Sequence, residues 1–187
     1  MSLTTGPASP LSLGPYHIIS YATVTGTTFF HSFINGIVMF RTLERPQFAS
    51  VQNKLFPIYF GMQASLPVLL SLTYPGGASP TFGASSSIPG VFDSGNTWTV
   101  LAPFATMLLT SGLNLGVLLP MVNKTMGKRY QQEKEDGKKS YDEGPHSEEM
   151  RALNKRFGML HGVSSLLNLA TFLAQVWYGF SLAGRLV

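Results

Sequence analysis

The sequence has no cysteine and few charged residues. Of its 187 residues, 12% are charged, whereas soluble domains carry about 25%. Without cysteine there is no disulfide, no thiolate metal site and no cysteine nucleophile. A phosphate-binding loop, a dinucleotide-binding glycine motif, a zinc-protease motif and a serine-hydrolase motif are also missing. These absences disfavour the common enzyme classes, and we expect a protein that is not an enzyme.

Apolar residues are abundant and form long runs. They make up 44% of the chain, and the mean hydropathy is positive, at +0.16. Windows without Asp, Glu, Lys or Arg that are long enough to cross a bilayer, which takes roughly 20 residues, lie at 16–40, 55–74, 97–122 and 157–184. We therefore expect an all-α membrane protein, a four-transmembrane-helix bundle that forms one domain over residues 1–187.

The positions of the cations predict an orientation. Residues 41–54 and 123–156 hold 12 of the 13 basic residues, whereas residues 75–96 hold none. By the positive-inside rule the two basic connections are cytosolic, so both termini are expected on the opposite, non-cytosolic side. Residues 1–15 are expected to form a flexible tail, 75–96 an irregular loop, and 123–156 a polar cytosolic loop in which the third helix continues beyond the membrane. Because the net charge of +4 flanks apolar segments, we expect the lipid bilayer as a partner and not nucleic acid.

Polar side chains inside the apolar windows follow helical spacings of three and four residues, so they share one face of each helix. Hydrocarbon makes an unpaired polar group costly, and these faces should point into the bundle. The intramembrane polar residues that we single out are His31, Asn35, Gln63, Asn114, His161, Ser164, Ser165 and Asn168. At about 1.5 Å per residue from the nearest cytosolic cation, His31, Asn114 and Asn168 lie near the membrane midplane, and Asn35 and His161 form a shallower layer.

Two interpretations of these residues remain open. The polar groups could hydrogen-bond across helices and fix their packing, at about 0.6 kcal/mol per pair. Alternatively, His31 and His161 could bind haem or a metal, or relay protons. No carboxylate or thiol lies in any window to complete a metal site, so no cofactor is predicted. His146, in the polar loop, is expected to be solvated.

The stretch FRTLERPQFASVQNKLFPIYF resembles the signature of the transmembrane protein 205 family. That signature is F-R-x-L-x-R-x-x-F at the end of the first helix, followed by V-Q-x-K-L-F-P-x-Y-F at the start of the second. The matching positions are Phe40, Arg41, Leu43, Arg45, Phe48, Val51, Gln52, Lys54, Leu55, Phe56, Pro57, Tyr59 and Phe60. Asn114 with Pro120 is similar to the motif N-x5-P of the third helix, and His161 to Leu169 is similar to H-G-x-S-S-L-x-N-L of the fourth.

This resemblance implies a small four-helix membrane protein without an established biochemical activity. It implies a role in organising or trafficking with other membrane components, together with a homo-oligomer or a membrane-protein partner. The alternative is a transporter of small solutes or metal, or a haem- or metal-binding protein. His161 lies within the motif and His31 outside it, which makes His161 the better cofactor or metal candidate.

Two prolines and two polar residues are expected to shape the connection between the first two helices. We expect Pro46 to end helical continuity and Pro57 to lie in the first turn of the second helix, where its missing N–H costs nothing. Gln52 and Lys54 are expected to cap or bridge the connection.

Overall fold

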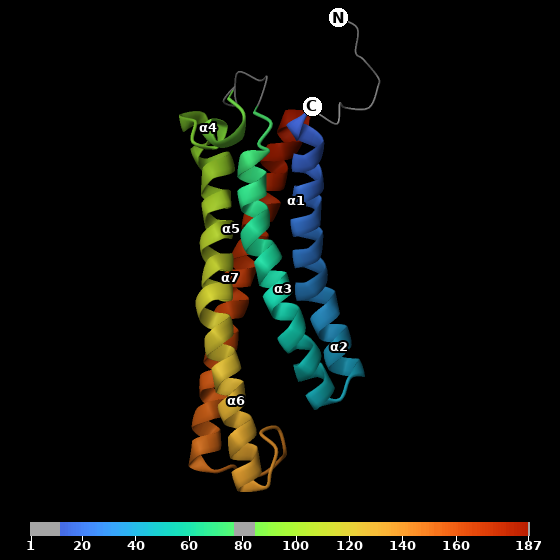
Figure 1. The fold of residues 1–187 in the computed structure, drawn as a ribbon, viewed down its shortest axis with the longest axis vertical. Coiled ribbons are helices and arrows are strands. Elements are labelled where there is room, and N and C mark those ends of the chain that lie inside the picture. Colours follow the sequence, from blue (N-terminus) through green and yellow to red (C-terminus); the bar gives the residue numbers. More distant parts are fainter. Residues whose placement is uncertain (1–11, 77–84, 187) are drawn as a thin grey trace, which may run out of the picture.

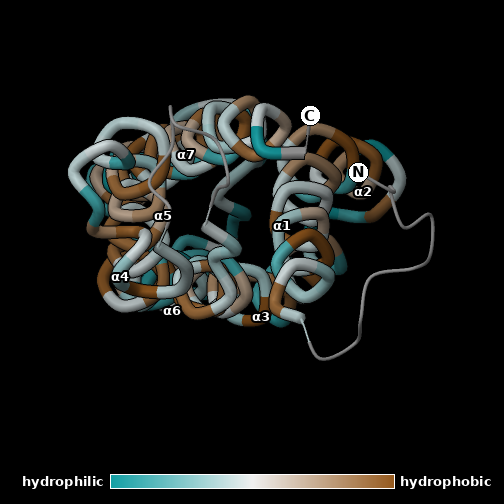
Figure 2. Tube along the Cα trace, turned by 90° about the horizontal axis from the view of Figure 1, so that it is seen from above, coloured by the Kyte–Doolittle hydropathy of each residue, from teal (hydrophilic) through white to brown (hydrophobic). Residues whose placement is uncertain are grey.

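The computed structural model describes residues 12–76 and 85–186, and every regular element in these two ranges is a helix. Long helices run lengthwise beside one another (Figure 1), and an end-on view shows them arranged around a common axis (Figure 2). The predicted all-helical class is confirmed.

The first helical run contains a π-helical turn. It consists of α1 (Leu13–Phe29), the turn η1 (Phe30–Asn35) and α2 (Gly36–Thr42). In η1 the backbone N–H of Gly36 donates to the carbonyl of His31, five residues earlier. Such a turn adds one residue and rotates the side chains that follow it. Together the three elements cover the apolar window predicted at 16–40.

The second long helix, α3 (Arg45–Leu72), starts earlier than the window 55–74 predicted. Pro46 does not end helical continuity, as expected from the sequence, but lies in the first turn of α3. A first-turn residue needs no N–H donor, so proline is well suited to start a helix. Pro57 consequently lies inside α3 and not in its first turn. The backbone N–H of Glu44 donates to Gln47 Oε1 at 3.3 Å, so this pair, and neither Gln52 nor Lys54, caps the connection.

The segment predicted as an irregular loop at 75–96 contains short helices. They are α4 (Ser87–Val91) and the 3-10 turn η2 (Ser94–Asn96), while residues 77–84 lie outside the described residues. Asn96 holds this segment together because its Nδ2 donates to Gly90 O at 2.7 Å and its Oδ1 accepts from Arg185 at 2.9 Å. Neither helix can be read from a stretch so rich in Gly, Ser and Pro, since tertiary contacts fix them.

The third run also contains π-helical turns and leaves the predicted membrane segment as a helix. It comprises η3 (Thr97–Leu101), α5 (Ala102–Leu113), η4 (Asn114–Leu118) and α6 (Leu119–Asp136). Gly137 terminates α6 with a φ of 62°, a conformation that glycine adopts without strain. The prediction that this helix continues beyond residue 122 is confirmed.

The last helix, α7 (Glu148–Leu186), pairs with α6 through a structured connection. Glu133 Oε1 accepts from the backbone N–H of Ser140 at 3.0 Å, and Arg129 donates to Asn154 Oδ1 at 2.9 Å. Burial alone would raise the pKa of the Glu133 carboxyl, but the hydrogen bonds from Ser140 and the Lys139 ammonium hold it below its ordinary value. Contacts of these side chains therefore order the start of the predicted polar loop.

The apolar core occupies the half of the bundle nearest α4. Its buried side chains come from α1, from α3 and the residues just after it, from α4, η3 and α5, and from the last third of α7. They are Val24, Leu70, Tyr74, Val91, Val100, Phe104, Met107, Ala174, Tyr178 and Leu182. Toward the basic end, α2 and the start of α3 diverge from α6 and α7 (Figure 1). One half of the bundle is thus closed by large side chains, and the other half is where the helices separate.

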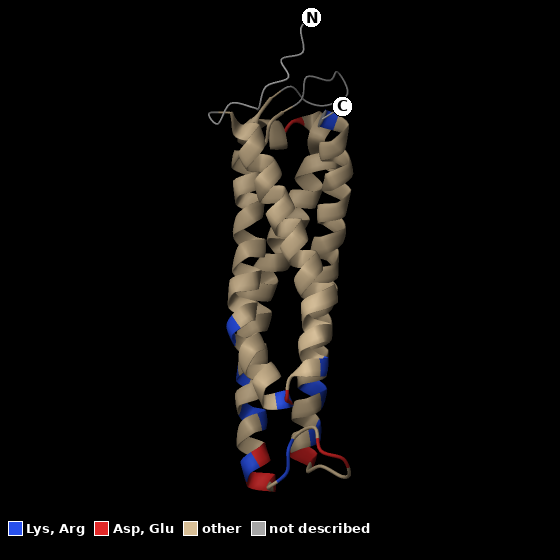
Figure 3. Ribbon diagram, turned by 90° about the vertical axis from the view of Figure 1, so that its right-hand side faces the viewer, with Lys and Arg blue, Asp and Glu red and all other residues tan. Residues whose placement is uncertain are grey.

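The exterior has the features of a membrane protein. Charged residues gather at one end, and the helices between the ends carry almost none (Figure 3). Within the described residues, three helices are long and apolar enough to cross a membrane: Arg45–Leu72, Ser94–Asp136 and Glu148–Arg185. The first run, with its histidines, asparagine and many hydroxyl residues, is not among them.

Candidate functional site

A cavity lies where the helices separate. It has a volume of about 420 Å³ and is bounded by η1 and α2 of the first run, by α3, and by the middle of α7. Aromatic side chains form much of its wall: Phe33, Phe40, Phe48, Phe56, Tyr59, Phe60 and Phe172. Its polar lining is His31, Ser32, Gln52, His161, Ser164, Ser165 and Asn168. Within residues 12–76 and 85–186, no Asp, Glu, Lys or Arg side chain lines this cavity.

Most of the residues singled out from the sequence meet at this cavity. Of the intramembrane polar residues, His31, His161, Ser164, Ser165 and Asn168 line it, and of the motif residues, Phe40, Phe48, Gln52, Phe56, Tyr59 and Phe60 do. Asn35, Gln63 and Asn114 lie outside the lining, as do the motif residues Arg41, Arg45, Lys54 and Pro57. The intramembrane polar residues and the motif residues therefore lie in neighbouring parts of one region.

The inner wall of the cavity is a hydrogen-bond network that joins three helical runs. Tyr59 OH donates to Asn168 Oδ1 at 2.6 Å, and Asn168 Nδ2 donates to Ser32 Oγ at 2.7 Å. Gln63 Nε2 lies 3.0 Å from Asn168 Oδ1 and 3.0 Å from Thr28 Oγ1. Each of these groups is on a different helical run from at least one of its partners. Gln63 and Asn168 thus hydrogen-bond across helices, as the packing interpretation of the polar residues expects.

His31 is held in one orientation beside the network. Asn35 Nδ2 donates to His31 Nδ1 at 3.1 Å, so in the neutral imidazole the proton is on Nε2. The ring centroid of His31 lies 4.2 Å from that of Tyr59, and 5.3 Å from that of Phe56 in an edge-on arrangement. His31 thus reaches the cavity as an aromatic ring with one N–H left to donate.

His161 also lines the cavity and comes from α7. Its ring is stacked parallel to Phe157, with centroids 5.9 Å apart. Among the residues that the structure describes, there is no group of three or more His, Cys, Asp or Glu side chains that could hold a metal ion. The two histidines of the cavity could still bind haem or act as hydrogen-bonding groups.

Gln52 lines the cavity with an unsatisfied acceptor. Its side chain is only 9% exposed, and its Oε1 has no hydrogen-bond partner. Lys54, by contrast, is exposed. The motif Q-x-K therefore faces in two directions: its glutamine points away from solvent into the bundle, and its lysine does not.

The other family-motif residues of the first connection pack on one another. The guanidinium of Arg45 lies 4.0 Å above the ring of Phe40, which meets Phe48 at a centroid distance of 5.5 Å. Asn114, which is fully buried, donates from Nδ2 to Ser164 O at 3.3 Å and so ties η4 to α7. These residues fix the positions of the helices that surround the cavity.

A second buried polar cluster was missed in the sequence. His17 is 0% exposed, with Nδ1 3.2 Å from Thr73 Oγ1 and Nε2 2.5 Å from Tyr178 OH. Thr73 donates its own proton to Leu69 O at 2.7 Å, so His17 Nδ1 is the donor to Thr73, and Nε2 accepts from Tyr178. The sequence contained the information needed to find His17, because it precedes Ser20 by three residues and so extends the polar face of the first helix by one turn.

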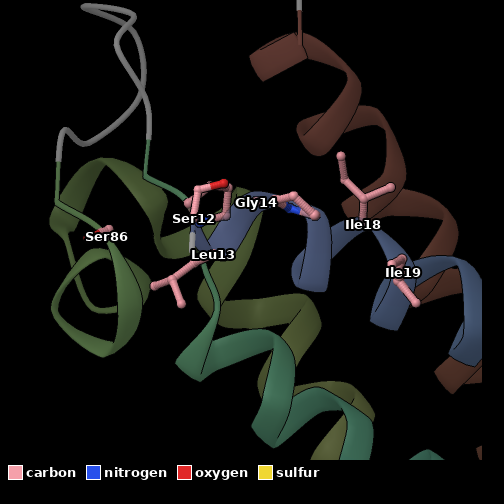
Figure 4. Close-up of a pocket in the computed structure, with 8 residues that line it drawn as sticks. Ser12, Leu13, Gly14, Ile18, Ile19 and Ser86 are labelled. Atoms are coloured by element: carbon pink, nitrogen blue, oxygen red, sulfur yellow. The ribbon is translucent and has the colours of Figure 1, made fainter. Parts of the chain in front are cut away.

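A groove at that same end has a volume of about 670 Å³ and is open. It is formed by the start of α1, including Leu13, Ile18 and Ile19, and by Ser86 (Figure 4). No titratable side chain lines it. The cavity beside His31 and Gln52 is therefore the candidate site.

Residues 19–131 match the model of a family described as "Domain of unknown function (DUF4149)". The chain is also similar to the "Xanthocillin biosynthesis cluster protein D" of Aspergillus fumigatus, with 28% identity over 176 residues that cover 94% of this chain and 92% of the relative. No solved structure matches.

Proposed function

The chain belongs to the DUF4149 family, and since that family's description assigns no role, we propose a function from the chain's own geometry. The protein is a multi-pass membrane protein of the transmembrane protein 205 type that works without catalysis, and it organises or traffics with other membrane components by holding a membrane-soluble molecule in the cavity. The observation that carries this proposal is the cavity itself, which is aromatic, uncharged and set between helices whose outer surfaces are apolar.

The lining favours binding over chemistry. Small-molecule sites are mostly apolar, with a few placed polar groups and volumes of about 300–1,000 Å³. This cavity has that character, and its polar groups are imidazoles, hydroxyls and amides. Acid–base catalysis needs a group within reach of the reacting proton and a partner that tunes it. His31, whose Nδ1 is engaged by the Asn35 amide and whose ring lies against Tyr59 at an interplanar angle of 37°, has no such ionised partner among the described cavity residues.

The proposed topology has four spans, with the run formed by α1, η1 and α2 as the first. The polar side chains of this run lower its hydropathy. Three of them do not face lipid because they are buried in the bundle, namely His17, Ser20 and Thr28. The Asn35 amide donates to His31. Single cysteines at Ser12, Ser85 and Glu143, all exposed, test this topology with a membrane-impermeant maleimide on sealed vesicles. The cysteines at Ser12 and Ser85 should react from one side and the cysteine at Glu143 from the other. If the cysteine at Ser12 reacts from the side of Glu143, the first run does not cross the membrane and the four-span topology is contradicted.

The binding function is tested by what the protein carries out of the membrane. The wild-type protein, purified in mild detergent, is extracted with organic solvent and the extract is analysed by mass spectrometry. We expect a compound retained in stoichiometric amount by the wild type and by Thr110→Val, whose hydroxyl pairs with Thr171 away from the cavity. The compound should be depleted in Gln52→Met. Equal recovery from all three proteins would show that retention does not involve the cavity.

A second candidate function is haem or metal binding, or transport of a small solute or metal. It is favoured by the placement of His31 and His161 on the same cavity, and the relative's name links that protein to a small-molecule biosynthesis cluster. The purified protein should then show a Soret band or bound metal that is lost in His161→Ala. A spectrum without a Soret band, together with no metal by elemental analysis, removes haem and metal binding from this candidate.

A further inference from the structure

We infer that the cavity binds an uncharged, flat ring compound that carries a hydroxyl group and dissolves in the membrane, an inference that rests on the proposed binding function. The class of ligand follows from three features of the lining: its aromatic wall, its lack of charge and its unsatisfied amide.

The aromatic wall favours a flat ring. Phe56 and Phe60 are stacked with an interplanar angle of 13° and a centroid distance of 5.5 Å, and His31 lies 4.2 Å from Tyr59 on the same side of the cavity. Phe33 of η1 and Phe172 of α7 also line the cavity, and their ring centroids lie 5.2 Å apart. Aromatic rings pack against one another in offset or edge-on geometries and gain energy beyond the buried area. A ring that enters the cavity therefore has aromatic side chains of three helical runs to pack against.

The absence of charged side chains in the lining selects a neutral ligand. A carboxylate or ammonium buried in this cavity would lose its hydration without gaining an ion pair, which is costly. Arg45, whose guanidinium lies over Phe40, does not line the cavity. An anionic headgroup is therefore a poorer occupant than a neutral hydroxyl.

Gln52 and His31 select the hydroxyl. Among the described buried side-chain atoms without a hydrogen-bond partner, Gln52 Oε1 belongs to a residue that lines this cavity. Such an atom is rarely left unsatisfied. The Gln52 oxygen needs a hydrogen-bond donor. His31, whose Nδ1 accepts from Asn35, has an N–H at Nε2 that needs an acceptor. Gln52, Phe56 and Tyr59 lie on one face of α3, so both polar groups flank the aromatic wall. A hydroxyl both donates and accepts, so it can satisfy either group.

The test uses three probes with one ring system: 2-naphthol, naphthalene and 2-naphthoate. Binding to the full-length protein in nanodiscs is measured by equilibrium dialysis, and partition into empty nanodiscs is subtracted. The wild type should bind 2-naphthol about two- to twelvefold more tightly than naphthalene, the range that one neutral hydrogen bond supplies. 2-Naphthoate should bind more weakly than either. Gln52→Met should abolish the preference for 2-naphthol, and Thr110→Val should keep it.

Each outcome bears on the inference. If naphthalene and 2-naphthol bind equally to the wild type, or if 2-naphthoate binds best, the inference of a neutral hydroxyl ligand is wrong, although the proposed binding function stands. If no probe binds above empty nanodiscs and no compound is extracted from the purified protein, both are wrong. Should Gln52→Met not fold, as judged by circular dichroism, His31→Phe replaces it. This variant keeps a ring against Tyr59 and removes the donor, so the preference should fall in it too.

Discussion

Asn168 is the hub of the hydrogen-bond network, and its removal gives the sharpest test of how the bundle is held together. Its side chain accepts from Tyr59 and Gln63 and donates to Ser32, at 2.6, 3.0 and 2.7 Å. Measured interhelical hydrogen bonds in membrane proteins average about 0.6 kcal/mol. Losing all three in Asn168→Ala should therefore lower the free energy of unfolding by about 2 kcal/mol.

Asn114→Ala is the matched control, because Asn114 is also an asparagine inside the bundle but makes a single interhelical bond, to Ser164 O at 3.3 Å. This control should cost about 0.6 kcal/mol. Both variants are unfolded by titrating SDS into mixed micelles, with helix content followed by circular dichroism. If Asn168→Ala is no more destabilising than Asn114→Ala, the network does not bind the three runs together, and the reasoning is refuted.

Further predictions concern other parts of the fold. The pKa of the Glu133 carboxyl is held below its ordinary value of 4.5, so the stability that its contacts add is present at neutral pH and lost as pH falls below 4.5. Hydrogen exchange measured against pH should show acid unfolding of the α6–α7 connection in the wild type. This pH dependence should be lost in Glu133→Gln. A methyl group on Gly179 would overlap the Tyr21 hydroxyl, so Gly179→Ala should cost about 1–3 kcal/mol in the SDS titration, and adding Tyr21→Phe should recover part of it; strictly additive effects would contradict the overlap. His17→Phe leaves the Tyr178 hydroxyl without its acceptor and should destabilise by about 1–3 kcal/mol, whereas a wild-type midpoint in the same titration would show that this bond contributes nothing.

The helices were predictable from the sequence because hydrophobic runs between charged connections leave few alternatives. The polar faces of the helices were predictable for the same reason: in an apolar solvent, Gln63 and Asn168 need hydrogen-bond partners, and the structure provides them with partners on other helices. The start of α3 was not predictable from the apolar window, because its first turns carry Arg45, Gln52 and Lys54 and lie outside the run of uncharged residues.

The cavity could not be read from the sequence, although most of its lining could. Its shape depends on the π-helical turn at residues 30–35, which rotates α2 relative to α1, and no residue preference marks such a turn. Gln52 was assigned to the helix connection because it stands near charged residues. Its burial follows from its position two turns before Tyr59 on α3, a relation that appears only when the helix is known to begin at Arg45.

His17, which is buried, and His31, which is half-buried, differ in what surrounds them, and this difference separates structural from ligand-binding roles. His17 has both ring nitrogens satisfied by Thr73 and Tyr178 within the apolar core, so it needs no further partner. His31 has one nitrogen satisfied by Asn35, and its ring borders a cavity that also contains the unsatisfied Gln52 oxygen. If these groups served only for packing, the folded state would be more stable with the groups paired or replaced by apolar residues. The unsatisfied Gln52 oxygen in the cavity wall is therefore best explained by a partner that comes from outside the chain.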